Sequence, residues 1–183
     1  MKAFVFKNPM NGIGFKNTIP WKSDIGRGYF DVLTIGLGNN AVVIGYNTFK
    51  NMNYKPFPNR RNYIMTRSPE IAAESCGSDV VFESSIGNIL MLDSIFDEVF
   101  VVGGETMFKI FEPFFTEIYV IMIHKYSQID SFFMIDLRSY EKHCIKELIE
   151  NTNLLSFLFY VREGPTPKNK IEFPLQQNNI TIN

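Results

Sequence analysis

Two apolar runs of this sequence each end in glycine and lead into a segment that we expect to be helical. The first is VVIGYNTF at 42–49, and the second is VFVVGGETMF at 99–108. In an α/β sheet, ligands bind at the carboxyl ends of strands, where helix N-termini offer free N–H groups and a positive dipole end. Two such ends suit a dinucleotide, although a single Gly-Gly pair is more often a plain tight turn.

Further apolar runs alternate with potential helices along most of the chain. The expected strands cover 3–6, 41–44, 62–66, 80–82, 99–102 and 118–123, and the expected helices cover 24–34, 48–52, 87–95 and 106–111. This alternation is typical of an α/β fold with a largely parallel sheet. The runs at 143–149 and 154–161 flank a polar turn, which predicts an antiparallel hairpin at the C-terminal edge of the sheet.

The composition indicates one globular domain. The chain has 183 residues, 45% of them hydrophobic, and a formal net charge of −1, so it offers no basic face for nucleic acid. Cys76 and Cys144 lie far apart and in no CxxC pattern, which gives a disulfide framework or a metal site no support. No stretch suits a signal peptide or a membrane span. We expect a cytoplasmic protein and a monomer, with neither membrane nor nucleic acid as a partner.

A third expected strand ends at Thr66 and Arg67. A hydroxyl and a fixed cation at this place suit the 2′-phosphate of an NADP adenosine. A lone arginine is more often a solvated surface charge, so the interpretation depends on the other strand ends.

Four motifs in this order resemble the dihydrofolate reductase family. They are GIGFKNTIPW at 12–21, VIGYNTF at 43–49, PFPNRRNYIMTR at 56–67 and VVGGETMF at 101–108, and the match spans residues 3–161. The resemblance implies a mixed, mainly parallel sheet flanked by helices, and NADPH-dependent reduction of dihydrofolate to tetrahydrofolate in a deep cleft. It implies a dihydrofolate reductase-like domain at 1–163 and a C-terminal extension at 164–183, which we expect to be an extended arm or partly disordered.

The resemblance also assigns roles to individual residues. Those expected at the NADPH cofactor are Ile13, Gly14, Asn17 and Thr18 in a lid, Gly45, Tyr46, Asn47 and Thr48 in one phosphate turn, Thr66 and Arg67 at the adenosine, and Val102, Gly103, Gly104, Glu105, Thr106, Met107 and Phe108 in the second turn. Those expected at the substrate are Phe4, Phe30, Met52, Phe57, Arg60 and Ile121. Arg60 matches the arginine that grips the glutamate tail, because a planar fork suits a carboxylate.

The sequence departs from the family pattern at the catalytic acid. The family has an Asp or Glu four residues before the helix phenylalanine, where it holds the pterin and helps to protonate N5. Four residues before Phe30 stands Gly26, and the threonine that supports the acid is replaced by Ile121. Tyr46 and Phe108 also differ from the family residues at their positions. The cofactor half of the pattern is mostly kept, whereas the catalytic corner is not.

Asp24 is the candidate replacement for the missing acid, with Trp21 as the second candidate catalytic residue. On a regular helix, residues two apart point to nearly opposite sides, so Asp24 would more naturally serve as the N-cap of the helix. Gly26 and Gly28 weaken the helix start. If the segment unwinds, Asp24 can swing into the cleft and relay a proton through water.

Three functions of different classes remain open. The first is a dihydrofolate reductase with a displaced acid, and the second is a related reductase of another heterocycle, such as the pyrimidine of riboflavin synthesis. The third is a catalytically impaired homologue that binds NADPH or a pterin without turnover. Arg60 favours the first function over the second, since it suits a substrate that ends in a carboxylate, while Gly26 and Ile121 favour the third over the first.

Overall fold

The computed structural model describes residues 1–69 and 80–163, so the expected C-terminal extension at 164–183 lies outside the described residues. The strands are β1 (Lys2–Lys7), β2 (Gly12–Gly14), β3 (Asn40–Gly45), β4 (Arg61–Met65), β5 (Val80–Glu83), β6 (Glu98–Gly103), β7 (Glu117–Ile123), β8 (Ser131–Phe132), β9 (Tyr140–Glu150) and β10 (Asn153–Arg162). The α-helices are α1 (Asp24–Ile35), α2 (Tyr46–Asn51), α4 (Ile86–Leu90) and α5 (Glu105–Phe111). Short 3₁₀ helices cover Met91–Ser94, Glu112–Phe114 and Leu137–Ser139.

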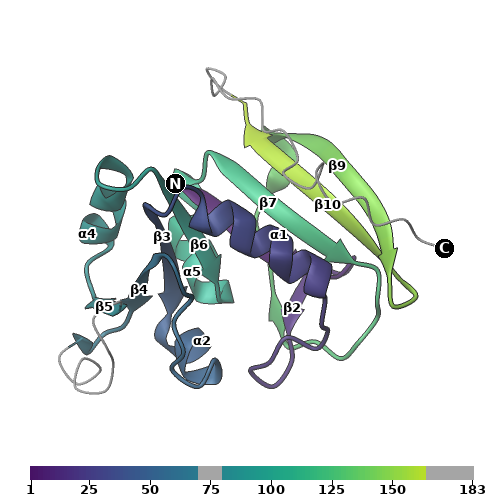
Figure 1. The fold of residues 1–183 in the computed structure, drawn as a ribbon, viewed down its shortest axis with the longest axis horizontal. Coiled ribbons are helices and arrows are strands. Elements are labelled where there is room, and N and C mark those ends of the chain that lie inside the picture. The colour runs from purple at the N-terminus through teal and green to yellow at the C-terminus, as the bar shows by residue number, and fades with distance from the viewer. Residues whose placement is uncertain (70–79, 164–183) are drawn as a thin grey trace.

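Eight strands form one twisted sheet in the order β5-β4-β3-β6-β1-β7-β10-β9 (Figure 1). The pairs from β5 to β7 are parallel, and β10 pairs antiparallel with both β7 and β9. The prediction of a mixed, mainly parallel sheet with a C-terminal antiparallel hairpin is therefore confirmed.

The central strands are buried on both faces, because helices cover each side of the sheet. Side chains alternate along β1, so Ala3 and Val5 join one apolar cluster and Phe4 joins the other. Helix α5 packs on the first side through Met107 and Phe111. Helix α1 packs on the second side and crosses the sheet in Figure 1. The two clusters thus hold one helix on each face of the sheet.

Some elements differ from the sequence-based expectation. The helix expected at 87–95 is divided into α4 and the 3₁₀ turn Met91–Ser94. Helix α2 begins at Tyr46 instead of residue 48, directly after the glycine that ends β3. The small sheet formed by β2 and β8 was not predicted, because strands of three and two residues leave no periodic pattern.

Candidate active site

The carboxyl ends of β3 and β6 lie side by side, with Ile44 in register with Gly103. Each end feeds a helix whose N-cap is glycine, Gly45 for α2 and Gly104 for α5, and neither helix has a side-chain cap. A Cβ atom on Gly104 would lie 3.1 Å from Oγ1 of Thr48, so the two turns approach closely because residue 104 is glycine. Backbone N–H groups of two helix starts thus meet at one edge of the sheet, which fits the phosphates of a dinucleotide.

The third strand end completes this edge. Strand β4 pairs parallel with β3, so Thr66 and Arg67 follow at the neighbouring position. The Thr66 N–H donates to the Glu83 carbonyl at 2.9 Å, which ties this end to β5, and the Arg67 side chain is exposed. The structure therefore brings the three predicted cofactor segments together, with the exposed Arg67 cation at one end.

The predicted lid is a tight turn that follows β2 of the small two-stranded sheet. Phe15 and Thr18 exchange backbone hydrogen bonds of 2.9 and 3.0 Å, and Lys16 and Asn17 between them have positive φ angles of 48° and 62°. That combination is typical of a two-residue hairpin turn. Ile13 and Gly14 lie in β2, which pairs with β8.

Two carboxylates that the sequence analysis did not connect hold this region in place. Asp130 accepts a 2.8 Å hydrogen bond from the Lys16 N–H, and Glu105 accepts a 3.0 Å hydrogen bond from the Phe132 N–H. The loop is thereby joined to β8 and, through Glu105, to the N-terminus of α5. Hydrogen bonds thus connect the expected lid, through β8, to the second of the two glycine turns, at the start of α5.

The predicted substrate wall is an aromatic cluster on the α1 side of the sheet. Ring centroids of Phe4 and Phe30 lie 5.0 Å apart, and those of Phe30 and Phe57 also lie 5.0 Å apart. Ile121 belongs to the same buried cluster, and Met52 and Phe57 both pack against a second cluster that contains Ile44. The structure brings these residues together, and their contact with a pterin stays a prediction.

Arg60 lies against this wall but is not open to solvent. Its guanidinium carbon lies 5.4 Å from the Phe30 ring centroid, and its side chain has no exposed surface. Nε donates to the Pro58 carbonyl at 2.8 Å, Nη1 donates to Thr34 Oγ1, and Nη2 donates to Asp31 Oδ1 at 2.8 Å. The pairing with Asp31 was not predicted, since the two residues are far apart in sequence, and the tail-binding role of Arg60 stays a prediction.

The position expected for the catalytic acid is enclosed by apolar and hydroxyl groups. A Cβ atom on Gly26 would lie 2.7 Å from Phe6 Cε1, 2.7 Å from Ser23 Oγ and 3.3 Å from Ile121 Cδ1. The Phe6 ring and the Ile121 side chain therefore fill the space into which a residue-26 side chain would extend. We call this cluster of Phe6, Gly26 and Ile121 the apolar corner.

The prediction that Asp24 is the N-cap of α1 is wrong. Ser23 occupies that position, and its Oγ accepts a 2.8 Å hydrogen bond from the Gly26 N–H. Glu150 Oε1 accepts two more hydrogen bonds of 3.0 Å, from the N–H groups of Asp24 and Ile25. These contacts satisfy the helix start despite the glycines, so the segment is helical and not unwound. The Asp24 side chain is exposed on the first turn, outside the apolar corner.

Two buried tyrosines share the α1-side cluster without offering a titrating proton. Burial raises the pKa of Tyr29, and burial together with the neighbouring Glu117 carboxylate raises the pKa of Tyr119. The Tyr119 hydroxyl donates to Glu117 at 2.9 Å. Both phenols therefore stay protonated at neutral pH.

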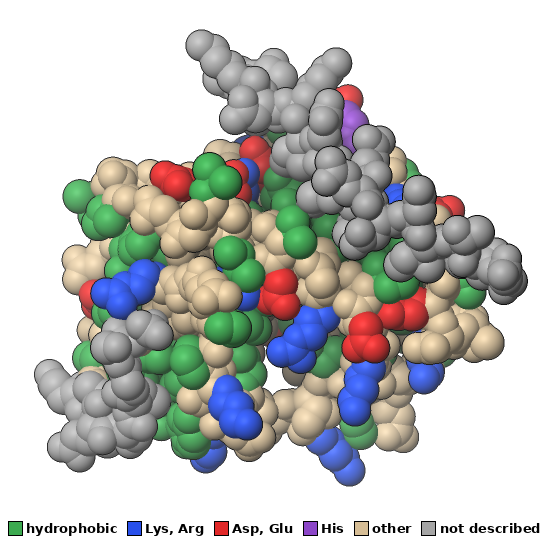
Figure 2. Space-filling model, in the orientation of Figure 1, with side chains coloured by type: hydrophobic (Ala, Val, Ile, Leu, Met, Phe, Trp, Pro, Cys, Tyr) green, Lys and Arg blue, Asp and Glu red, His purple; other side chains and the backbone are tan. Residues whose placement is uncertain are grey.

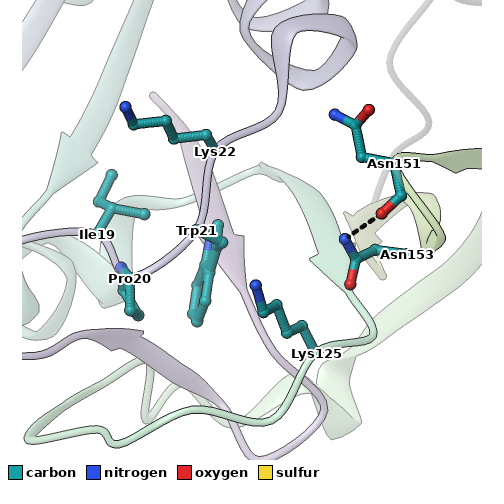
Figure 3. A pocket seen from close by; sticks show the side chains of 7 residues that line it. All are labelled: Ile19, Pro20, Trp21, Lys22, Lys125, Asn151 and Asn153. Carbon is teal, nitrogen blue, oxygen red and sulfur yellow. Dashed lines mark hydrogen bonds between the residues drawn. The ribbon is translucent and has the colours of Figure 1, made fainter.

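Trp21 is 6% exposed, and its Nε1 has no hydrogen-bond partner among the described residues. It borders an open hollow of about 470 Å³ (Figure 3), which is lined by Ile19, Pro20, Trp21, Lys22, Lys125, Asn151 and Asn153. Asn153 donates to the Asn151 carbonyl at 3.0 Å, so one of the two amides is already engaged. None of the residues that line this hollow has an acidic side chain.

The surface and the helices carry further information about partners. On the face shown in Figure 2, basic and acidic side chains are interspersed and do not gather into one charged area. Within residues 1–69 and 80–163, no helix combines the length and apolar character that crossing a bilayer requires. The same residues contain no group of three or more potential metal ligands.

Glycine-capped helix starts beside an aromatic wall define an α/β protein built for a dinucleotide and a flat heterocycle. Comparison with known proteins makes the class specific. The family model described as dihydrofolate reductase matches residues 2–163. The chain belongs to the dihydrofolate reductase family.

Individual relatives agree with this assignment. The chain is 30% identical to dihydrofolate reductase of Bacillus subtilis over 125 residues, which cover 68% of this chain and 70% of that protein. It is 27% identical to the Staphylococcus haemolyticus enzyme over 153 residues, covering 82% and 87%. Among solved structures, dihydrofolate reductase from Enterococcus faecalis complexed with NADP(H) and RAB-propyl matches with a TM-score of 0.78 and 26% identity, covering 89% of this chain and 96% of that one.

Proposed function

We propose that this chain catalyses NADPH-dependent reduction of dihydrofolate to tetrahydrofolate. The observation that carries the proposal is the meeting of the Gly45 and Gly104 turns at one sheet edge, beside the aromatic wall of Phe4, Phe30 and Phe57. NADPH supplies the hydride when it is bound. The wall excludes water from one side of the heterocycle, and the turns orient the cofactor toward it.

The reduction adds a hydride to carbon and a proton to nitrogen, and the source of the proton is the unusual part of this site. The apolar corner of Phe6, Gly26 and Ile121 contains no titratable side chain. We infer that the proton comes from solvent water, since an exposed carboxylate at Asp24 lies outside the corner. Hydride transfer without a protein acid is still accelerated when the site holds the nicotinamide and the heterocycle in the right orientation.

The apolar corner supports one alternative, a homologue that binds NADPH or a pterin with little turnover. The two proposals differ in rate and not in binding. Trp21 is the sole tryptophan, so quenching of its fluorescence reports binding of each ligand, and loss of NADPH absorbance with dihydrofolate reports turnover. Binding with oxidation supports the reductase, whereas binding without oxidation supports the alternative.

We further infer that the protein acts as a cytoplasmic monomer on small molecules alone. The interspersed surface charges in Figure 2 and the net charge of −1 give a phosphate backbone no extended basic face. The free and exposed Cys144 is compatible with a reducing compartment. Sedimentation at several protein concentrations tests the monomeric state, because the apparent mass of a protein that dimerises increases with concentration.

A further inference from the structure

The ion pair between Asp31 and Arg60 lies at the edge of the substrate wall. The Arg60 side chain is fully buried, whereas the Asp31 side chain is 39% exposed. The cation is thus covered, and the carboxylate is the accessible member of the pair.

The guanidinium is held rigidly by its other contacts. Nε donates to the Pro58 carbonyl, and Nη1 donates to the Thr34 hydroxyl, which itself donates to the Phe30 carbonyl at 2.7 Å. Three of the five N–H donors of Arg60 are therefore engaged, the third with Asp31. A ligand carboxylate has to displace Asp31 or compete with it for the same cation.

The electrostatics of this exchange favour an uncharged ligand group. Asp31 already neutralises Arg60, so a second carboxylate gains little net attraction and is repelled by the first. Displacing Asp31 also breaks a charge-assisted hydrogen bond of 2.8 Å. A ligand substituent without charge pays neither cost.

We propose that Asp31 is a specificity-determining residue, which removes the affinity that a carboxylate tail would obtain from Arg60. The site then accepts a dihydropterin with an uncharged substituent as well as it accepts dihydrofolate. This inference rests on the proposed function, because it concerns the substrate class of the same site.

The test compares two substrates, dihydrofolate and 6-methyl-7,8-dihydropterin, with NADPH as the donor. Wild-type protein should reduce both with similar kcat/KM. Asp31→Asn leaves an acceptor for Arg60 without the negative charge, so kcat/KM for dihydrofolate should rise about tenfold while that for the methyl compound stays unchanged. Equal effects on both substrates, or no effect on either, would overturn the proposal.

Two further variants control for charge and for folding. Asp136→Asn removes the same charge from another Asp–Arg pair, the exposed pair with Arg138, and should change neither substrate. Asp31→Glu keeps the carboxylate, so the ratio of kcat/KM for dihydrofolate to kcat/KM for the methyl compound should stay at its wild-type value. Thermal unfolding of each variant shows whether an altered ratio comes from a folded protein. A ratio in Asp31→Glu that differs from the wild-type ratio also contradicts the proposal.

Binding separates this inference from the proposed function. If wild-type protein oxidises no NADPH with either substrate, the proposed reaction fails. Trp21 fluorescence then compares binding of folate and 6-methylpterin to wild type and Asp31→Asn. Tighter folate binding in the variant alone supports the specificity role even without turnover, and unchanged folate binding rejects it.

Discussion

A Cβ atom on Gly26 would lie 2.7 Å from Cε1 of Phe6. That distance is too short for unchanged packing, so a larger residue at 26 requires the Phe6 ring to move. Residue 26 stands four positions before Phe30, where the family resemblance expects the acid. A side chain at position 26 and the Phe6 ring in its present place therefore cannot both be accommodated.

Gly26→Asp is expected to destabilise the protein and to add little activity. Forcing extra atoms into a packed site costs about 1–3 kcal/mol, and here the new side chain meets Phe6 and the Ser23 hydroxyl. Combining Gly26→Asp with Phe6→Ala provides room, so the double variant should gain turnover over the Phe6→Ala parent. Chemical denaturation and NADPH oxidation measure the two effects. A Gly26→Asp protein as stable as wild type would contradict the close packing of Phe6 and Ile121 around residue 26.

Asp24→Asn tests the prediction that Asp24 is the displaced acid. Because its side chain is exposed on the first turn of α1, we expect turnover with dihydrofolate to change by no more than about twofold, far below the loss typical of a missing proton donor. Ser23→Ala is the matched variant for the helix start and should cost about 1 kcal/mol of stability without a specific loss of rate. A loss of about 10²- to 10⁴-fold for Asp24→Asn would instead establish Asp24 as the acid.

Arg67→Ala should weaken NADPH binding much more than NADH binding. The exposed guanidinium follows β4 at the cofactor edge, where it suits the 2′-phosphate that only NADPH carries. Titration of Trp21 fluorescence with each nucleotide gives both dissociation constants. Lys109→Ala is a basic-to-neutral control on α5, and equal losses for the two nucleotides in Arg67→Ala would remove this residue from the phosphate site.

Arg60→Met should lower the free energy of unfolding by roughly 1–3 kcal/mol, because it removes three directed hydrogen bonds from a buried side chain. Arg60→Lys should lose part of that amount, because an ammonium cannot keep the three directed contacts at once. Urea denaturation measures both losses. If Arg60→Lys is fully stable and only folate binding weakens, Arg60 serves the ligand and not the fold.

The sheet was predictable because its central strands are short continuous apolar runs, two of which, β3 and β6, end at glycine. That pattern also predicted a helix after each of these two glycines, whereas the register of β3 with β6 and the N-cap positions of Gly45 and Gly104 came only from the structure. The cap of α1 was assigned one residue too late, since Ser23 and Asp24 are both good cap residues and sequence does not rank them.

The remaining differences come from contacts between distant parts of the chain. The Asp31–Arg60 pair and the Glu150 contact with the start of α1 join residues whose neighbourhood is set only by packing. Phe6 was read as part of a buried strand, and its contact with Gly26 depends on how α1 crosses β1. Long-range contacts of this kind shape the site, and no local sequence pattern predicts them.

Hydride transfer itself is the most direct test of the central claim that this chain reduces dihydrofolate despite its apolar corner. NADPH deuterated at the transferable position of the nicotinamide is incubated with dihydrofolate and wild-type protein, and the product is analysed by mass spectrometry. We predict tetrahydrofolate that carries the deuterium, formed in proportion to the protein added. Tight NADPH binding with no labelled product above the protein-free background would contradict the account and identify the chain as a binding homologue.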